Sequence, residues 1–335
     1  MSTLRAVQCS TLLIALASIP GASQSSFSAS ARDSVRSFAS AGEVSVDTTF
    51  TVARNGVIDI SVPSGRLVVR GSERSTAALR TNGADYRLRS SGGGVTLAMA
   101  ESFERRSGVR SSSYRQTDEP EIELLVPRAV RLLINGKAAD VSVSDIAGDV
   151  EIHLQSGDVR LESLGGRAIV ETISGDIRAV NGVGDLRVTT VSGDLIARGI
   201  RGSIDVHTTS GTVALGVEGS ASVQVEVVSG DILFDGSFAD DARLQLTTHS
   251  GDVVVQLPES ARGELDVTSY NGEVRGAAIT LKPSREEGVR SGRNDRSTRH
   301  YEFGGGGAAR ITITTFSGDV SIQRGAGRRS EETRP

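Results

Sequence analysis

The chain has 335 residues, of which 37% are hydrophobic, 39 are glycine and none is tryptophan. This composition is lean for one large globular core and favours a fold with a narrow core. The 37 basic and 41 acidic residues nearly balance, so no overall field would attract nucleic acid or anionic lipid, and we expect no nucleic-acid partner.

Residues 1–23 are typical of a secretory signal peptide. Arg5 supplies a positive charge, and an apolar run extends from Thr11 to Ile19 before Pro20. That run is too short for a membrane span, which needs about 20 apolar residues, and no later segment is comparable. We therefore expect an exported protein, secreted, periplasmic or on the cell surface, without a transmembrane segment. Cys9, the only cysteine, lies within this segment, so no disulfide is expected.

Residues 24–42 are predicted to be a disordered linker, and residues 43–325 to be one β-rich domain. Its first unit is an alternating apolar run that ends in Ser64-Gly65-Arg66. The segment 101–119 is charged and serine-rich with hardly any apolar residue, which predicts a polar insertion. After it, the pattern resumes with Ile122, Leu124 and Val126.

The most informative feature is a repeat of six Ser-Gly-Asp triplets. The triplets begin at Ser156, Ser174, Ser192, Ser229, Ser250 and Ser317, and the first three lie 18 residues apart. The residues six, four and two positions before each serine are apolar or threonine, as in Val150, Ile152 and Leu154. Two degenerate units at Ser210 and Asn271 follow the same rule, except that Ser269 precedes Asn271 where other units have an apolar residue or threonine. Period-two alternation on both sides of each triplet predicts two short strands per unit, joined at a glycine-containing corner.

Two topologies fit this pattern. Units that stack in parallel would form a repeat β-solenoid, resembling a parallel β-helix, with equivalent residues about 4.8 Å apart. An antiparallel meander of hairpins is the alternative, because hairpins also use two-residue corners. The fixed phase of equal residue types over eight units favours the solenoid. A second polar insertion is predicted at 282–307, where it interrupts the final unit, and residues 326–335 are predicted to be a disordered tail.

These features resemble the bacterial DUF4097 family, whose members are often labelled "putative adhesins". The resemblance covers about Val44 to Ile322 and rests on Val126-Pro127, on the run of triplets, and on Ile311-Thr312-Ile313 followed by Ser317-Gly318-Asp319-Val320. It implies an exported or envelope-associated β-rich domain. The family brings no catalytic residues to transfer.

The triplet aspartates would form one column in a solenoid. Such a column could hold calcium, because adjacent carboxylates repel and a divalent cation would bridge them. The simpler interpretation is that each aspartate accepts hydrogen bonds from the backbone of its own corner. We favour the second interpretation and expect no metal and no cofactor. The residues of the calcium alternative are Asp158, Asp176, Asp194, Asp231, Asp252 and Asp319.

No motif of a known enzyme class occurs, and His153, His207, His249 and His300 are scattered. We therefore expect a non-catalytic structural or adhesive module without catalytic residues. Its partner would be an envelope polysaccharide or a cell-surface protein. The alternative is a carbohydrate-binding or polysaccharide-cleaving protein on a β-helix scaffold, with Arg160, Arg178 and Asp205 in a groove on one face. The outward residues Ile169, Ile173, Val191 and Ile196 suggest a covered or contacting face.

Overall fold

The computed structural model of the chain describes residues 46–53, 55–82, 86–91, 94–99, 120–277, 282–283 and 297–324. All of them belong to one compact unit, Ser34–Pro335, and every regular element among them is a β-strand. The predicted all-β class is therefore confirmed. The predictions for the signal segment 1–23, the linker 24–42, the insertion 101–119 and the tail 326–335 lie outside the described residues.

Each repeat unit is a flat coil of two strands. Strand β8 (Val150–Ser156) leads through the corner Ser156-Gly157-Asp158 into β9 (Val159–Glu162), and a second corner leads on to β10 (Ala168–Ser174). Strands β8 and β10 pair in parallel, with Val150 opposite Ala168 and Ser156 opposite Ser174. Strand β9 pairs in parallel with β11 in the next coil. This register confirms the solenoid and excludes a meander in the repeat region.

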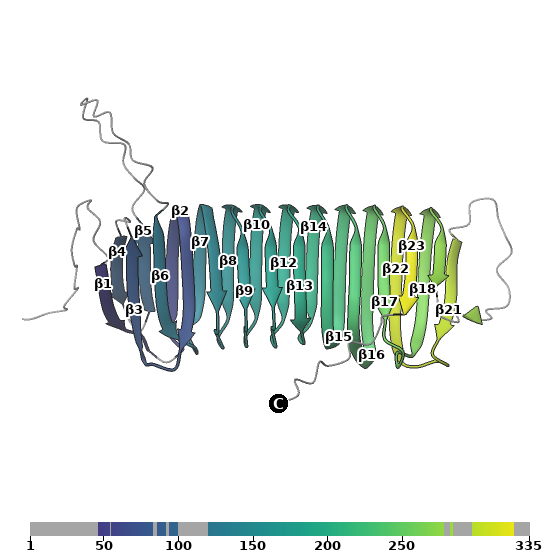
Figure 1. Ribbon diagram of the computed structural model, residues 1–335, viewed down its shortest axis with the longest axis horizontal. Helices are drawn as coiled ribbons and strands as arrows, with labels where there is room; N and C mark the ends of the chain where they lie inside the picture. Colours follow the sequence, from purple (N-terminus) through teal and green to yellow (C-terminus); the bar gives the residue numbers. More distant parts are fainter. Residues whose placement is uncertain are drawn as a thin grey trace, which may run out of the picture. The chain divides into compact units, whose positions relative to one another are not determined.

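The strands before the corner form one flat face of the stack, called face A, and the strands after it form the opposite face, called face B (Figure 1). Face A consists, in stacking order, of β5 (Gly94–Met99), the first part of β2 (Val57–Ser72), the first part of β7 (Arg131–Ser144), β8, β10, β12 (Leu186–Ser192), β14 (Ile204–Ser210), the second parts of β15 (Val213–Ser229) and β16 (Ile232–Ser250), β22 (Ala309–Ser317) and β18 (Gly263–Asn271).

Face B follows the same order. It consists of β6 (Glu121–Pro127), the second parts of β2 and β7, β9, β11 (Ile177–Val180), β13 (Leu195–Ile200), the first parts of β15 and β16, β17 (Val253–Leu257), β23 (Val320–Arg324) and β19 (Val274–Ala277).

Antiparallel strands cover both ends of the stack. At one end, β4 (Tyr86–Ser91) pairs with β5, β3 (Thr76–Asn82) pairs with β6, and β1 (Val46–Thr51) pairs with β3. At the other end, β21 (Ser297–Phe303) pairs with β18, and β20 (Lys282–Pro283) pairs with β21. Strands β20 and β21 fall within the segment 282–307. Such end strands occupy edges that would otherwise offer unpaired backbone groups.

The last coil in the sequence is not the last coil in space. Strand β22 lies between β16 and β18, and β23 lies between β17 and β19. The coil of β18 and β19 is therefore complete without residues after 277, and the coil of β22 and β23 is inserted between it and its neighbour in the sequence. The expectation that the segment 282–307 interrupts one final unit is wrong.

The core is the double layer of inward side chains between faces A and B. Of the three inward positions before each corner, the first two are nearly all fully buried, as in Val150 and Ile152. The third holds threonine in three consecutive coils, at Thr172, Thr190 and Thr208. Each threonine hydroxyl donates a hydrogen bond to the carbonyl oxygen of the corner serine two residues later, at 3.1–3.3 Å. These buried hydroxyls are therefore satisfied within their own corner.

Candidate functional site

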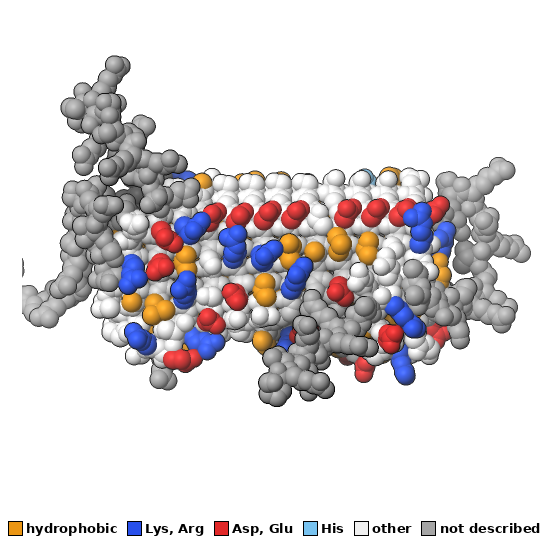
Figure 2. Space-filling model, viewed as in Figure 1, with side chains coloured by type: hydrophobic (Ala, Val, Ile, Leu, Met, Phe, Trp, Pro, Cys, Tyr) orange, Lys and Arg blue, Asp and Glu red, His pale blue; other side chains and the backbone are white. Residues whose placement is uncertain are grey.

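The corner acids form one row along the edge where faces A and B meet. This acid row, seen in Figure 2 as a line of red side chains, contains Asp140, Asp158, Asp176, Asp194, Asp231, Asp252, Asp319 and Glu273. One carboxylate oxygen of each of seven aspartates accepts the backbone N–H of the next coil, as from Asp176 to Asp158 at 3.1 Å and from Thr212 to Asp194 at 2.7 Å. The row is thus a ladder of hydrogen bonds between coils, interrupted once where Thr212 takes the place of an aspartate.

Three details of this row differ from the expectation. The aspartates bind the backbone of the following coil instead of their own corner. Asp319 follows Asp252 directly, and Glu273 comes last, because β22 and β23 are inserted. Asp140 also belongs to the row although no Ser-Gly precedes it; its position 18 residues before Asp158 was the available signal. The second carboxylate oxygen of each aspartate accepts no backbone N–H of this kind. Calcium binding to these oxygens, the alternative interpretation, therefore stays a prediction.

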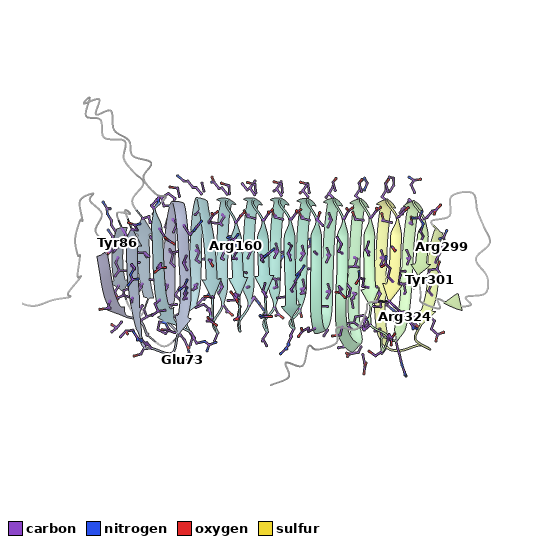
Figure 3. All side chains as sticks on the ribbon, in the orientation of Figure 1. Glu73, Tyr86, Arg160, Arg299, Tyr301 and Arg324 are labelled. Carbon is purple, nitrogen blue, oxygen red and sulfur yellow. The ribbon has the colours of Figure 1, made fainter. Side chains whose placement is uncertain are left out.

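Directly before the first residue of each corner lies a second row of side chains, called the edge column. It contains Lys137, Gln155, Ile173, Val191, Thr209, Val228, His249, Phe316 and Tyr270. Figure 3 shows that side chains project in a row along the upper edge of the stack. Ile173, Val191 and Val228 are 55%, 49% and 52% exposed. Five of the eight large hydrophobic side chains that are exposed in the described part of the chain lie in this one column. It is a continuous, partly apolar surface.

Three rings of the edge column stack on one another although they are distant in the sequence. The His249 and Phe316 rings are parallel with their centroids 4.8 Å apart, and the Tyr270 ring is tilted against Phe316 at 5.3 Å. The insertion of β22 between β16 and β18 brings them together. Because the ring faces meet each other along the stack, mainly the ring edges are presented to solvent.

Face A carries two similar ionic clusters, three coils apart. In the first, His153 lies between Glu151, at 3.0 Å from Nε2, and Glu171, at 3.1 Å from Nδ1, while Arg131 contacts Glu151 at 3.1 Å. In the second, His207 lies between Asp205 and Glu226. Its Nε2 is 2.9 Å from Asp205 Oδ1 without hydrogen-bond alignment. The four histidines are scattered in the sequence, and the carboxylate partners of His153, His207 and His300 were not anticipated from it.

The first cluster affects the ionisation of Glu151. The hydrogen bond from His153 lowers the pKa of the Glu151 carboxyl below its usual value, and Arg131 lowers it further, against the opposing effect of burial. The carboxylate form is therefore favoured in the folded protein.

The residues pictured in a catalytic groove do not come together. Arg160 and Arg178 point outward from β9 and β11 on face B, whereas Asp205 points outward from β14 on face A. The corner reverses the chain, so outward residues before and after it lie on opposite sides of the stack. The outward apolar residues are likewise dispersed: Ile173 and Val191 are in the edge column, and Ile169 and Ile196 lie on faces A and B. They do not form one covered face.

An apolar cavity of about 10 Å³ lies near the second corners of β9 to β13, lined by Leu161, Leu164, Ala179, Leu186 and Ile200 among others. Such a volume holds roughly one water molecule. Across the described ranges, no group of three or more His, Cys, Asp or Glu side chains converges as a metal ion would require. The described part of the chain also has no helix of the length and apolarity needed to cross a membrane.

Comparison with protein families gives one match. The model of the family described as Toastrack DUF4097 matches residues 128–238 and 183–323, two overlapping segments that together cover more than half of the chain. No curated protein matches.

Several solved structures are similar. One is titled as a putative cell adhesion protein from Clostridium sporogenes (11% identity, covering 84% of this chain and 100% of that chain, TM-score 0.24). Another is titled as a putative lipid binding protein from Parabacteroides distasonis (12%, 83% and 96%, 0.48). A third is titled as a putative adhesin from Bacteroides fragilis (12%, 84% and 98%, 0.38).

Proposed function

The chain belongs to the DUF4097 family, and we propose that it is a non-catalytic, exported structural or adhesive module that acts through the outer surface of its stacked strands. One observation carries the proposal: the side chains able to make chemical contacts stand in rows on the outside of the stack, while the interior is packed with aliphatic residues.

Rows of identical spacing suit adhesion for a physical reason. Each coil repeats the same outward positions about 4.8 Å further along the stack, so a partner that fits one coil can engage several at once. Contacts that are individually weak then add up to a strong attachment. Export is supported by the signal-like segment 1–23, and an envelope polysaccharide or a cell-surface protein is the partner that an exported surface would meet.

Retention on cells tests the adhesive function. The purified full chain is immobilised and incubated with whole bacterial cells and, separately, with isolated envelope polysaccharides. Retention of cells or polysaccharide by the folded protein, and none by the heat-unfolded protein, is the expected result. If the folded chain retains neither, the adhesive function is wrong.

The non-catalytic part of the proposal has its own test. The same polysaccharides are incubated with the protein, and the release of new reducing ends is measured over hours. We expect none above the level of a protein-free sample. Release that depends on folded protein would establish the polysaccharide-cleaving alternative instead.

A further inference from the structure

The edge column and the acid row together form a two-sided surface strip. In most coils the exposed residue of the edge column precedes an acid by three positions, as Val191 precedes Asp194 and Val228 precedes Asp231, and only the Ser-Gly corner lies between them. The coil between these two examples carries Thr209 and Thr212 at the same positions. On either side of that threonine pair, apolar and aromatic side chains run along one side of the strip and carboxylates along the other. An unpartnered strip of this kind matches a ligand with an apolar and a basic side next to each other.

The carboxylates in the middle of the strip form no direct ion pairs. Asp194, Asp231 and Asp252 have no ion-pair partner within the described ranges, although Asp252 interacts with the more distant Arg275 electrostatically. The neighbouring outward position on face B, two residues after each acid, holds Ile196, Leu233 and Val254 there, instead of the arginines found after Asp158 and Asp176. Since each of these aspartates uses one oxygen for the ladder, the other remains free to accept from a cationic partner.

The spacing of the strip indicates which conformation of ligand fits. Coils repeat about every 4.8 Å, and an α-helix repeats every 5.4 Å per turn, so a helix lying along the strip drifts by about 2.4 Å over four turns. A flexible lysine or arginine side chain spans that difference. An extended peptide repeats its side chains on one face about every 6.8 Å, so it shifts by about 2 Å relative to each coil. That shift is about three times the shift of a helix per turn.

We infer that the strip is a docking surface for a basic amphipathic helix, with the helix's apolar side on Ile173, Val191, Val228 and Phe316 and its basic side on the acid row. This deepens the proposed function, because it names the partner chemistry of one surface of the adhesive stack. The six coils from Ile173 to Phe316 span a length of about 24 Å, which corresponds to roughly 16 helical residues.

A synthetic peptide tests the inference. The probe is a fluorescent 18-residue peptide of leucine and lysine with all leucines on one helical face, and it is titrated with the full chain while anisotropy is measured. We expect saturable binding that weakens as salt is raised, because the contacts are exposed ion pairs. A peptide with glutamate in place of lysine, and one of the same composition with the leucines scattered, should both bind at least about tenfold more weakly.

Paired variants locate the contact. Asp231→Asn with Asp252→Asn keeps the amide oxygen that accepts the next coil's N–H but removes both charges, and should raise the Kd about tenfold. Val191→Ser with Val228→Ser should raise it by a similar factor. The matched controls are Asp235→Asn, an exposed acid on face B, and Val183→Ser, which is exposed at the opposite edge; both should leave the Kd unchanged.

The inference is overturned by any of three results: no binding of the leucine-lysine peptide, equal binding of the scattered peptide, or equal effects of the strip and control variants. Retention of cells by a protein that binds no peptide would leave the proposed adhesive function standing and remove only this partner. If the protein binds the peptide but retains no cells, the helix-docking strip stands and the proposed adhesive function is wrong.

Discussion

At the scale of single residues, the corner glycine is the most constrained position. Gly193 has a φ of +131°, and a Cβ placed on it would lie 2.1 Å from the carbonyl oxygen of Gly175 in the preceding coil. The residue is therefore glycine for two reasons: the backbone angle disfavours any side chain, and the neighbouring coil leaves no room for one. The repeat of this contact from coil to coil is what allows the corners to stack closely.

Replacing two glycines by alanine separates the effect of the backbone angle from the effect of the clash between coils. Gly193→Ala should lower the free energy of unfolding by about 2–4 kcal/mol, because it adds a backbone clash between coils to an unfavourable φ. The control is Gly219→Ala, where φ is +69° and nothing lies within 4 Å of the added Cβ; it should cost only about 1 kcal/mol. Urea unfolding followed by circular dichroism measures both. Equal losses would show that the packing of corners adds nothing.

At the scale of strands, ionic clusters connect neighbouring coils across face A. In the cluster of Arg131, Glu151, His153 and Glu171, two contacts of 3.1 Å join β7 to β8 and β8 to β10, and a third of 3.0 Å lies within β8. Backbone pairing alone would hold these strands in any register that keeps the alternation. Specific side-chain pairs between adjacent strands add to the preference for the observed register.

This cluster predicts a pH dependence. The folded state lowers the pKa of Glu151, so its contribution to stability is present above the unfolded pKa, near 4.5, and is lost as the pH falls through the folded value. Glu151→Gln should therefore be less stable than the natural chain at about pH 6 and lose that disadvantage at about pH 3. Because the site is partly exposed, the difference should stay below about 1 kcal/mol.

Urea unfolding at both pH values measures this difference. The matched variant is Glu162→Gln on face B, whose carboxyl forms no ion pair within the residues described, and it is measured at the same two pH values for comparison. A difference for Glu151→Gln that is constant between the two pH values would contradict the assignment.

At the scale of the whole stack, the inserted coil of β22 and β23 separates two coils that follow one another in the sequence. Its fully buried side chains include Ile311, Ile313, Val320 and Ile322. It also forms ion pairs with the outer coil, between Arg310 and Glu264 at 2.8 Å and between Asp319 and Arg275 at 3.2 Å. The outer coil of β18 and β19 therefore packs on residues that are synthesised after it. Assembly of this end must wait for the last strands.

Truncation tests the importance of that order. A chain that ends at residue 308 loses both interfaces of the inserted coil and should be destabilised by roughly 3 kcal/mol or more. The control is removal of 176–193, one complete 18-residue coil, which rejoins equivalent corners and lets the flanking coils restack. Urea midpoints and the binding of a hydrophobic dye measure both variants. A milder effect of the truncation than of the coil deletion would contradict the inserted arrangement as a stabilising element.

The sequence alone determined the coil and its two sides. Alternation with period two identifies inward residues such as Ile152 and Val188, and the Ser-Gly-Asp triplets mark corners that need positive φ, because both requirements are local to a few residues. The repeat also favoured the parallel stack over a meander of hairpins, since equal residues at a fixed phase come into register when coils stack, and the observed strand register decided between the two. The DUF4097 resemblance, confirmed by the family match, rests on the same local pattern.

The tertiary structure decided the order of the coils and what meets on their surfaces. Every coil offers similar backbone edges, so nothing in residues 309–324 by themselves states that they fit between β16 and β18, or that β1, β3 and β21 cover the ends in antiparallel pairing. The stack of His249, Phe316 and Tyr270 and the separation of Arg160 from Asp205 follow from that order and from the corner's reversal of the chain. Such contacts depend on which strand edges pair with each other, and that pairing is determined by packing between segments that are distant in the sequence.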